Sequence, residues 1–301
     1  MKIAITGASG LIGRPLVPLL RQHGHDVVRF VRGSTGSTGS LAADELPWDP
    51  ARRELNPALL DDVDAVIHLA GAGVADHRWT TAYKKTVFDS RVDGTTAVAL
   101  ALAACSERPR VLLSASAVGF YGDTGDRVTD EKGQAGQGFL ADTCQAWEES
   151  TVPAERAGVR VAHLRTGIVL SGAGGALGKQ VKIFKAGLGA PLGSGKQWLS
   201  WISLHDELAA ITHLLTAEVD GPVNLVGPAP VTNREFTKVL GQVLHRPTLP
   251  VPVPGFVLTA ALGEFAGEGV LAGQRLVPKA LQDSGFVFSH PTLETALRAS
   301  L

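Results

Sequence analysis

Near its start this chain carries the stretch Lys2-Ile3-Ala4-Ile5-Thr6-Gly7-Ala8-Ser9-Gly10-Leu11-Ile12-Gly13, which decides the fold. The apolar, β-branched residues that open it predict a buried strand. Apolar residues at helical intervals follow from residue 11 to residue 20. Three glycines with the spacing G-x-x-G-x-x-G separate the two patterns. The stretch therefore predicts a strand, a tight turn and a helix.

Each of the three glycines has a physical role in such a turn. Gly7 lets the chain turn sharply off the strand, Gly10 lets the backbone approach a pyrophosphate, and Gly13 lets the helix pack on the sheet. Free N–H groups and the positive end of the helix dipole then face the phosphates. This context favours dinucleotide binding over a purely structural turn. We assign the binding role to Gly7, Ser9, Gly10, Leu11, Ile12 and Gly13.

Strand and helix patterns alternate along the chain after this turn. Further strands are expected at residues 25–32, 46–49, 65–70, 110–114 and 159–164, and helices at 11–22, 79–104 and 140–156. Repeated alternation of this kind is typical of a parallel sheet with right-handed crossovers. The predicted fold class is α/β, with a doubly wound parallel sheet of the Rossmann type.

The end of the second predicted strand indicates which dinucleotide is bound. An acidic residue there would accept from the adenosine 2′-hydroxyl of NAD, whereas an arginine would bind the 2′-phosphate of NADP. The chain has Arg29 and Arg32 and no carboxylate at this point. Arg32 is the better candidate, and the alternative is a solvated arginine at a strand end. The cofactor is therefore predicted to be NADP, and the glycine- and serine-rich residues 33–40 are expected to form a flexible loop.

Composition excludes several classes of function. The 28 basic and 29 acidic residues give a formal charge of −1, and no block of like charge indicates a nucleic-acid or membrane surface. Two cysteines do not make a disulfide framework, and no spacing indicates a metal site. No signal peptide or membrane-spanning run is evident. We expect a cytoplasmic monomer or homodimer, with a small molecule as its partner.

Several motifs occur together in this chain: the glycine triplet, the segments 68–71 and 164–167, and a serine-rich loop at residues 116–122. Together they resemble the extended short-chain dehydrogenase/reductase superfamily. Narrower features are Arg78-Trp79, Lys84, Ser90-Arg91, Gly193-Ser194-Gly195, Gln197-Trp198, Ser200-Trp201-Ile202, Asp206 and segments within residues 254–286. These features resemble a subfamily of nucleoside-diphosphate-sugar epimerase-like proteins with a small C-terminal domain of unknown function.

This resemblance covers essentially the whole chain and implies an arrangement of domains. An NADP-binding Rossmann domain would comprise residues 1–169 and 204–230. A smaller α+β substrate-side domain would comprise residues 170–203 and 231–301. The cofactor site would also include Leu69, Ala70, Gly71 and Ser114. Helices are expected in the tail at residues 256–262, 271–283 and 291–299.

The chain departs from the superfamily in its catalytic residues. The superfamily uses a serine, a tyrosine and a lysine four residues after that tyrosine, and the lysine cation helps to lower the pKa of the phenol. Here Leu140 and Cys144 fall where the tyrosine and lysine are expected. In one interpretation Ser116 orients the substrate, and Tyr121 donates a proton with the help of a lysine from elsewhere, such as Lys84 or Lys132.

Two other interpretations remain open. A hydride-transfer enzyme could take its proton from water or from a carboxylate such as Asp123 or Asp126. Alternatively, the chain could bind NADP(H) without turnover and act as a regulator or sensor. We predict an NADP(H)-dependent oxidoreductase or epimerase-like enzyme that acts on a small polar substrate, with the regulator as the alternative.

Other polar residues have plainer expected roles. His68 is expected to be a hydrogen-bonded core residue, and Cys144 a buried small side chain. Asp206 and Glu207 are expected to stabilise the start of a helix through its dipole.

Overall fold

The computed structural model describes residues 1–33, 41–107 and 109–301. Most of the loop predicted at residues 33–40 therefore lies outside the described residues. The chain divides into two compact units. The first comprises Met1–Ser116, Gln145–Leu164 and Ile211–Pro222. The second comprises Ala117–Cys144, Arg165–Ala210 and Val223–Leu301. The predicted assignment of domains to cofactor and substrate stays a prediction.

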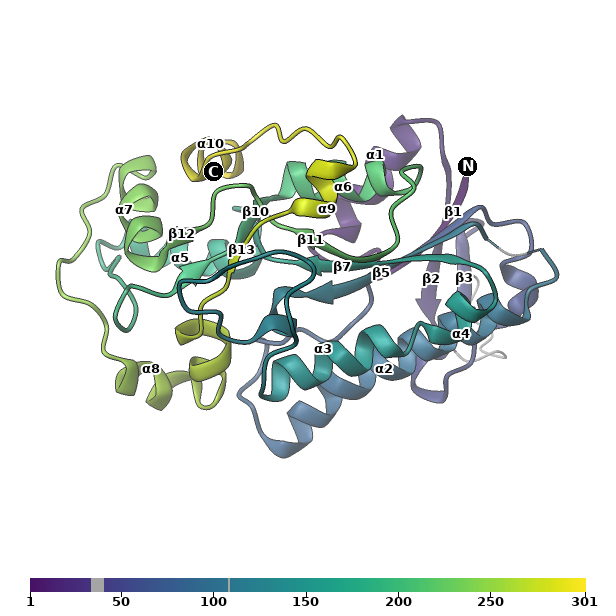
Figure 1. Ribbon diagram of the computed structural model, residues 1–301, viewed down its shortest axis with the longest axis horizontal. Coiled ribbons are helices and arrows are strands. Elements are labelled where there is room, and N and C mark those ends of the chain that lie inside the picture. The colour runs from purple at the N-terminus through teal and green to yellow at the C-terminus, as the bar shows by residue number, and fades with distance from the viewer. Residues whose placement is uncertain (34–40, 108) are drawn as a thin grey trace. The chain divides into compact units, whose positions relative to one another are not determined.

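A seven-stranded sheet in the order β11-β7-β5-β4-β1-β2-β3 forms the centre of the α/β fold, as predicted (Figure 1). Strand β1 pairs in parallel with both β2 and β4, so the winding of the chain changes direction beside β1. In open α/β sheets, ligands bind at such a switch point, beyond the carboxyl ends of the strands. The sheet strands are β1 (Lys2–Thr6), β2 (Asp26–Arg32), β3 (Glu45–Trp48), β4 (Ala65–His68), β5 (Val111–Ala117), β7 (Arg160–Thr166) and β11 (Gly221–Leu225).

Helices of the first unit fill the connections between these strands. Helix α2 packs against α4, and its buried alanines, valine and leucine join a core with residues from β1, β2, β4 and β5. The helical elements are α1 (Gly13–Gln22), the 3-10 turns η1 (Pro50–Arg52) and η2 (Pro57–Leu59), α2 (Thr81–Ala104) and α4 (Val152–Arg156). Two helices run across the unit boundaries, α3 (Phe139–Glu149) and α6 (Leu204–Leu214).

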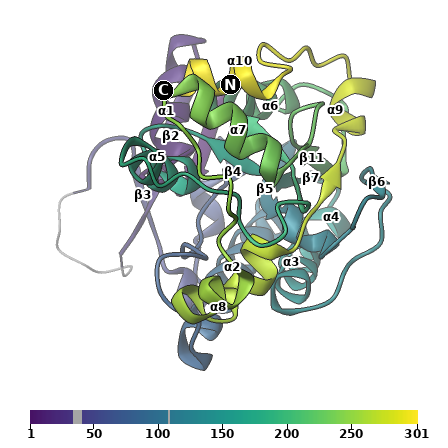
Figure 2. The same ribbon diagram turned by 90° about the vertical axis from the view of Figure 1, so that its left-hand side faces the viewer.

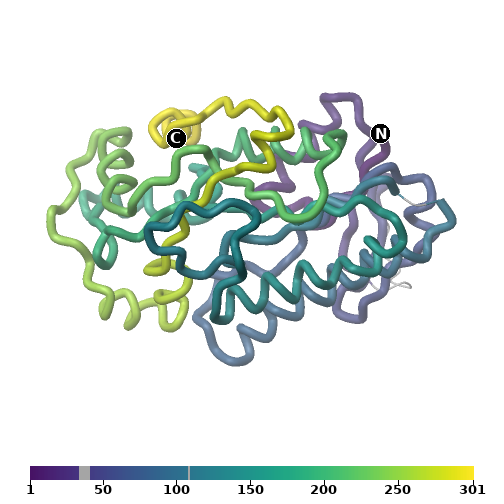
Figure 3. The backbone as a smooth tube through the Cα atoms, in the orientation of Figure 1, coloured from purple at the N-terminus to yellow at the C-terminus, as the bar shows by residue number. Residues whose placement is uncertain are grey.

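The second unit has its own core, in which α7 and α10 pack together with α5 and Trp201 (Figure 2). Its short strands form three separate pairs, β8 with β10, β9 with β12 and β6 with β13. The β6–β13 pair joins a loop near residue 128 to the tail near residue 275, and both can be traced in Figure 3. These elements are η3 (Val118–Tyr121), β6 (Val128–Thr129), β8 (Ile168–Leu170), α5 (Gly175–Lys185), β9 (Trp198–Leu199), β10 (Trp201–Ser203), β12 (Val231–Thr232), α7 (Asn233–Val243), α8 (Gly255–Leu262), a π-helical turn (Ala266–Leu271), β13 (Arg275–Leu276), α9 (Lys279–Asp283) and α10 (Leu293–Ser300).

Two predicted helices differ from the structure. The helix expected at residues 140–156 is interrupted between α3 and α4, because Pro153 has no N–H to continue the hydrogen-bond ladder. The prediction of a helix at residues 271–283 was wrong over its first half. There Arg275 and Leu276 pair with β6, and the helix begins only after Pro278.

Candidate functional site

The β1–α1 turn has the close backbone approach expected of a dinucleotide site. Gly7 has a φ of +69°, and a Cβ on it would lie 2.7 Å from the carbonyl carbon of Leu69. A Cβ on Gly13 would lie 2.3 Å from the Gly7 carbonyl oxygen. The amide of Gly10 donates to that same oxygen at 3.0 Å. No larger side chain fits at Gly7 or Gly13 without moving backbone, so the turn stays tight and free of side chains at these two positions.

Thr6 fastens this turn to the end of β4. Its hydroxyl oxygen accepts hydrogen bonds from the amides of Leu69 and Ala70, at 3.1 and 3.2 Å. The same oxygen lies 2.8 Å from Nδ1 of His68. Since the oxygen accepts two bonds, its proton is available for Nδ1, and burial lowers the pKa of His68 to about 4. The predicted role of His68 as a hydrogen-bonded core residue is confirmed.

Helix α2 holds the next part of the same loop. Ser90 Oγ accepts from the amide of Ala72 at 3.0 Å, and Arg91 donates to the Ala72 carbonyl at 2.9 Å. The guanidinium of Arg91 also lies over the ring of Trp147, 4.9 Å from its centroid. The segment that includes Gly71 is thus fixed from two sides. Leu69, Ala70 and Gly71 stay a prediction as cofactor contacts, on a loop that the structure shows to be tied to β1 and α2.

Arg32 and Arg29 differ in what they contact. Arg29 donates two hydrogen bonds to the carboxylate of Asp44, both at 2.9 Å, and these bonds hold the pKa of Asp44 well below its usual range. Arg29 also forms an ion pair with Glu45 at 3.1 Å. Arg32 is exposed at the carboxyl end of β2. Of the two arginines, Arg32 is therefore the one whose position suits a cofactor phosphate.

Strand β5 carries two buried serines with different surroundings. Ser114 is fully buried, and its hydroxyl has no hydrogen-bond partner among the described residues. Ser116 is 4% exposed and donates to Oε1 of Glu148 at 2.6 Å. A carboxylate that accepts the serine proton makes the serine oxygen a better acceptor for a second donor. No motif in the sequence marks Glu148 as a site residue, although it lies one helical turn beyond Cys144.

Tyr121 lies in the second unit, inside a buried polar network. Its hydroxyl donates to Oδ1 of Asn224 at 2.7 Å and accepts from Arg165 at 2.9 Å. The Arg165 guanidinium lies over the ring of Phe120, 3.4 Å from its centroid. Burial raises the pKa of Tyr121 to about 12, even though Arg165 acts to lower it. The hydroxyl joins two structural partners, and its pKa moves away from the range needed for proton exchange near neutral pH.

The positions of the missing tyrosine and lysine are packed closely against the turn that follows β5. A Cβ on Gly119 would lie 3.2 Å from Cβ of Leu140 and 3.9 Å from Sγ of Cys144. Cys144 is 4% exposed, which confirms the prediction that it is buried. Neither a leucine nor a buried thiol supplies the positive charge that a lysine would bring.

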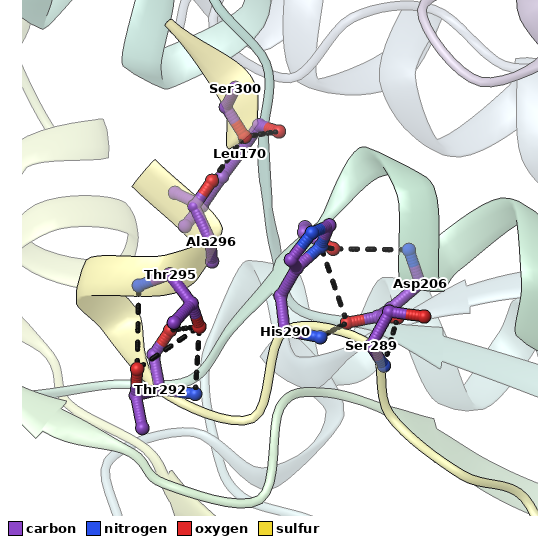
Figure 4. Close-up of polar contacts among 9 residues, drawn as sticks. Leu170, Asp206, Ser289, His290, Thr292, Thr295, Ala296 and Ser300 are labelled. Atoms are coloured by element: carbon purple, nitrogen blue, oxygen red, sulfur yellow. Dashed lines mark hydrogen bonds and ion pairs between the residues drawn. The ribbon is translucent and has the colours of Figure 1, made fainter. Parts of the chain in front are cut away.

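Asp206 and Glu207 are in the first turn of α6, but the dipole role predicted for them is incomplete. Asp206 is 1% exposed, and its carboxylate accepts from the amides of Ser289 and His290, at 2.9 and 3.0 Å (Figure 4). Nδ1 of His290 lies 3.0 Å from Oγ of Ser203, which also accepts from the amide of Asp206. Asp206 therefore binds the C-terminal segment through two backbone amides. The spacing of residues in the sequence does not indicate this partner.

Glu207 is fully buried beside the end of β7. Its Oε1 accepts from the hydroxyl of Thr166 at 3.0 Å, and its Oε2 has no hydrogen-bond partner among the described residues. Burial raises the pKa of Glu207 to about 8. The side chain is therefore largely protonated at neutral pH.

The described residues hold neither a cluster suited to a metal ion nor a helix suited to crossing a membrane. Within residues 1–33, 41–107 and 109–301, no group of three His, Cys, Asp or Glu side chains could hold a metal ion. No helix in that part of the chain is long and apolar enough to cross a membrane.

Comparison with known proteins assigns the family. Residues 3–227 match the model of the NAD dependent epimerase/dehydratase family. The chain belongs to this family. Residues 253–300 match a domain of unknown function, DUF1731. The family model thus covers the β1–α1 turn, both serines of β5 and Glu148, whereas the C-terminal match covers the segment that Asp206 holds.

Members of the epimerase family with similar sequences come from distant organisms. Epimerase family protein Mb2239 of Mycobacterium bovis is 48% identical over 98% of this chain and 96% of that protein. Epimerase family protein SDR39U1 of Homo sapiens is 31% identical over 99% of both chains. A crystal structure of the human protein with NADPH has a TM-score of 0.89 and 30% identity, covering 100% of this chain and 99% of that one.

Proposed function

We propose that this chain is an NADP(H)-dependent oxidoreductase or epimerase-like enzyme that acts on a small polar substrate. The observation that carries the proposal is the β1–α1 turn, where Gly7 and Gly13 leave no room for a Cβ and so let backbone come close to a ligand at the start of α1. A glycine-rich turn that leads from a strand into a helix start is a common phosphate-binding arrangement, helped by the positive end of the helix dipole. The human relative crystallised with NADPH supports the same cofactor.

The residues of the first unit fit this cofactor. The β1–α1 turn would hold the pyrophosphate, and Arg32 would bind the 2′-phosphate. The loop of Leu69, Ala70 and Gly71, with the unpartnered hydroxyl of Ser114, would complete the site. When bound, the nicotinamide supplies or accepts a hydride.

Proton handling in this proposal falls to Ser116 and Glu148 instead of a tyrosine and a lysine. The hydroxyl of Ser116 already donates to the Glu148 carboxylate. A substrate hydroxyl that donates to the Ser116 oxygen could lose its proton through the serine to that carboxylate, and a carbonyl could gain one by the reverse path. Tyr121 keeps a structural role, because its hydroxyl joins Asn224 and Arg165 and its pKa is about 12.

A cofactor titration tests the binding half of this proposal. Purified protein is titrated with NADPH and with NADH, and Arg32→Ala is compared with Arg52→Ala, a matched exposed arginine in η1. We expect NADPH to bind at least about tenfold more tightly than NADH, a preference worth ~1.4 kcal/mol. Arg32→Ala is expected to remove the preference and Arg52→Ala to keep it. Equal affinity of the unaltered protein for both coenzymes would remove the argument from Arg32.

A turnover screen tests the catalytic half. Oxidation of NADPH is followed with a panel of small carbonyl compounds, using Ser116→Ala, Glu148→Gln and Tyr121→Phe. We expect loss of about 10²-fold or more in kcat for the first two variants and a small change for the third. A second candidate function is a non-catalytic NADP(H)-binding regulator, favoured by Leu140 and Cys144 at the catalytic positions. Tight NADPH binding without turnover that depends on Ser116 or Glu148 would favour it.

A further inference from the structure

The second unit carries a surface on which positive charge is not balanced by carboxylates. Residues 171–203 and 231–263 contain seven lysines and arginines, all of them exposed, and a single acidic residue, Glu235. The whole chain, in contrast, has a formal charge of −1. The seven cations come from α5 and α7, which can be followed in Figure 2, and from the loops that come after these two helices.

The lysines of α5 have no acidic partner. Among the described residues, no carboxylate forms an ion pair with Lys182 or Lys185. On other helices a surface lysine pairs with an aspartate one turn away, as Lys85 does with Asp89. Helix α5 cannot do this, because residues 156–205 contain no Asp or Glu. The positive potential of this surface is therefore left for a partner to neutralise.

Exposed apolar side chains lie among these cations. Ile183 on α5 and Leu188 after it are both exposed. Val251 is 72% exposed, and Phe256, at the start of α8, is 76% exposed. No residue from 247 to 263 carries a charge. The surface thus combines unpaired cations with apolar groups that the chain itself does not cover.

Backbone hydrogen bonds hold the apolar and basic segments side by side within the second unit. The amides of Leu249 and Val253 donate to carbonyls in the loop after α5, at 2.7 and 2.8 Å. The amide of Arg234, at the start of α7, donates to a carbonyl further along the same loop at 2.9 Å. Helices α5 and α7 also share one core. The exposed side chains of residues 179–196 and 234–257 therefore form one continuous area, the basic surface.

We propose that the basic surface binds the face of a lipid bilayer that carries anionic headgroups. Lysines and arginines are attracted to the headgroup phosphates, and apolar side chains enter the boundary between headgroups and acyl chains. A nucleic acid offers charge along its backbone but no acyl layer for Leu188 and Val251.

The sequence predicts no membrane surface because its total charge is balanced. The fold changes this expectation, since it gathers cations from two separate segments of the chain and leaves the acidic residues elsewhere. Binding at the basic surface requires neither the cofactor nor turnover, so its test is independent of the proposed function.

Co-sedimentation of the full-length protein with sucrose-loaded vesicles tests the lipid partner. One set of vesicles is phosphatidylcholine alone, and the other contains about 30% phosphatidylglycerol. At about 50 mM salt we expect at least about tenfold tighter binding to the anionic vesicles, and we expect about 500 mM salt to remove most of it by screening. Equal binding to both kinds of vesicle, or no binding to the anionic ones, would overturn the proposal.

Two double variants with the same total charge test the place of binding. Lys182→Gln with Lys185→Gln removes two charges from α5, whereas Lys85→Gln with Lys279→Gln removes two charges from other helices. We expect the first pair to weaken binding to anionic vesicles about tenfold or more, which corresponds to ~1.4 kcal/mol, and the second to change it less than about twofold. Equal effects of the two pairs would place binding elsewhere and overturn the proposal.

Two valines test the apolar contribution. Val251 and Val287 are 72% and 83% exposed, and only Val251 lies on the basic surface. Val251→Ser is expected to weaken vesicle binding at least about threefold and Val287→Ser to leave it unchanged. Circular dichroism of each variant checks that the fold is intact. A double-stranded DNA fragment that binds as tightly as the anionic vesicles, with no effect of Val251→Ser on either, would identify a nucleic-acid surface and overturn the proposal.

Discussion

Replacing Glu207 by glutamine is expected to stabilise the protein, and the gain is expected to grow with pH. Glu207 is fully buried, with one carboxylate oxygen bonded to Thr166 and the other without a partner among the described residues. Burial raises its pKa from 4.5 to about 8. In the folded state the group therefore keeps a proton that the unfolded chain has already lost at neutral pH.

The sign and size of the effect follow from proton linkage. Between pH 4.5 and 8 the folded state binds more protons at Glu207 than the unfolded state, so stability falls as pH rises through this range. One pKa unit is worth ~1.4 kcal/mol. The cost of Glu207 is therefore about 3 kcal/mol at pH 6.5 and between about 4 and 5 kcal/mol at pH 8. Glutamine keeps the bond from Thr166 and carries no charge to bury, so it removes this cost.

His68 sets the useful pH window. Its pKa is lowered from 6.5 to about 4, so its linkage acts only below pH 6.5 and has the opposite sign there, raising stability as pH rises. Above pH 6.5 this linkage is small, and because Glu207→Gln leaves His68 unchanged it cancels when the variant is compared with the unaltered protein.

Urea unfolding followed by circular dichroism at pH 6.5, 7.2 and 8.0 measures the effect. Glu149→Gln, a change at an exposed glutamate on α3, is the matched control. We expect the gain from Glu207→Gln to increase by about 1–2 kcal/mol across this window, with no such trend for Glu149→Gln. A gain that is constant from pH 6.5 to 8, or no gain at all, would refute the reasoning.

Three further substitutions test other parts of the structure. Gly94→Ala places a Cβ 3.5 Å from its nearest neighbours on His68 and Trp48, which is ordinary van der Waals contact. Because alanine is the better helix former, we expect thermal unfolding to show α2 stabilised by about 0.5–1 kcal/mol, and a loss of stability would contradict this spacing. Gly13→Ala places a Cβ 2.3 Å from the Gly7 carbonyl oxygen, so we expect the protein to be destabilised by about 1–3 kcal/mol. Fluorescence titration is expected to show NADPH bound at least about tenfold more weakly, and unchanged binding would contradict the role of the turn. Tyr121→Phe removes the partner of Asn224 and Arg165 and should cost about 1–3 kcal/mol in urea unfolding while NADPH affinity stays the same; equal stability would argue against the network.

Local patterns in the sequence were sufficient to predict most of the sheet. The β-branched run before Gly7 and the apolar residues 65–68 form β1 and β4 where they were expected, because burial on both faces of a parallel strand leaves a strong local signal. The tail was harder. Residues 275–276 form a strand only because β6 lies beside them, and spacing along the chain does not show a partner almost 150 residues away.

The candidate site shows the same limit. The glycine turn depends on backbone geometry that glycine itself encodes, so its form could be predicted. The partner of Ser116 could not, since Glu148 is 32 residues away and a glutamate on a helix is usually a solvated residue. From the sequence alone, its phenol makes Tyr121 a candidate acid. Its hydrogen bonds with Asn224 and Arg165 favour a structural role instead. Both partners lie more than 40 residues away in the sequence, so local patterns do not reveal them.

The contact of Asp206 with the amides of Ser289 and His290 affects how the tail can be shortened. A chain cut before residue 289 would lose both donors. The Asp206 carboxylate, which is 1% exposed, would then lack the two backbone hydrogen bonds that stabilise it. The last dozen residues are also joined to β8, through the Ser300 hydroxyl and the Leu170 carbonyl (Figure 4). Shortening the chain from this end therefore removes the hydrogen bonds made by Ser289, His290 and Ser300. A purification tag is better attached at Met1.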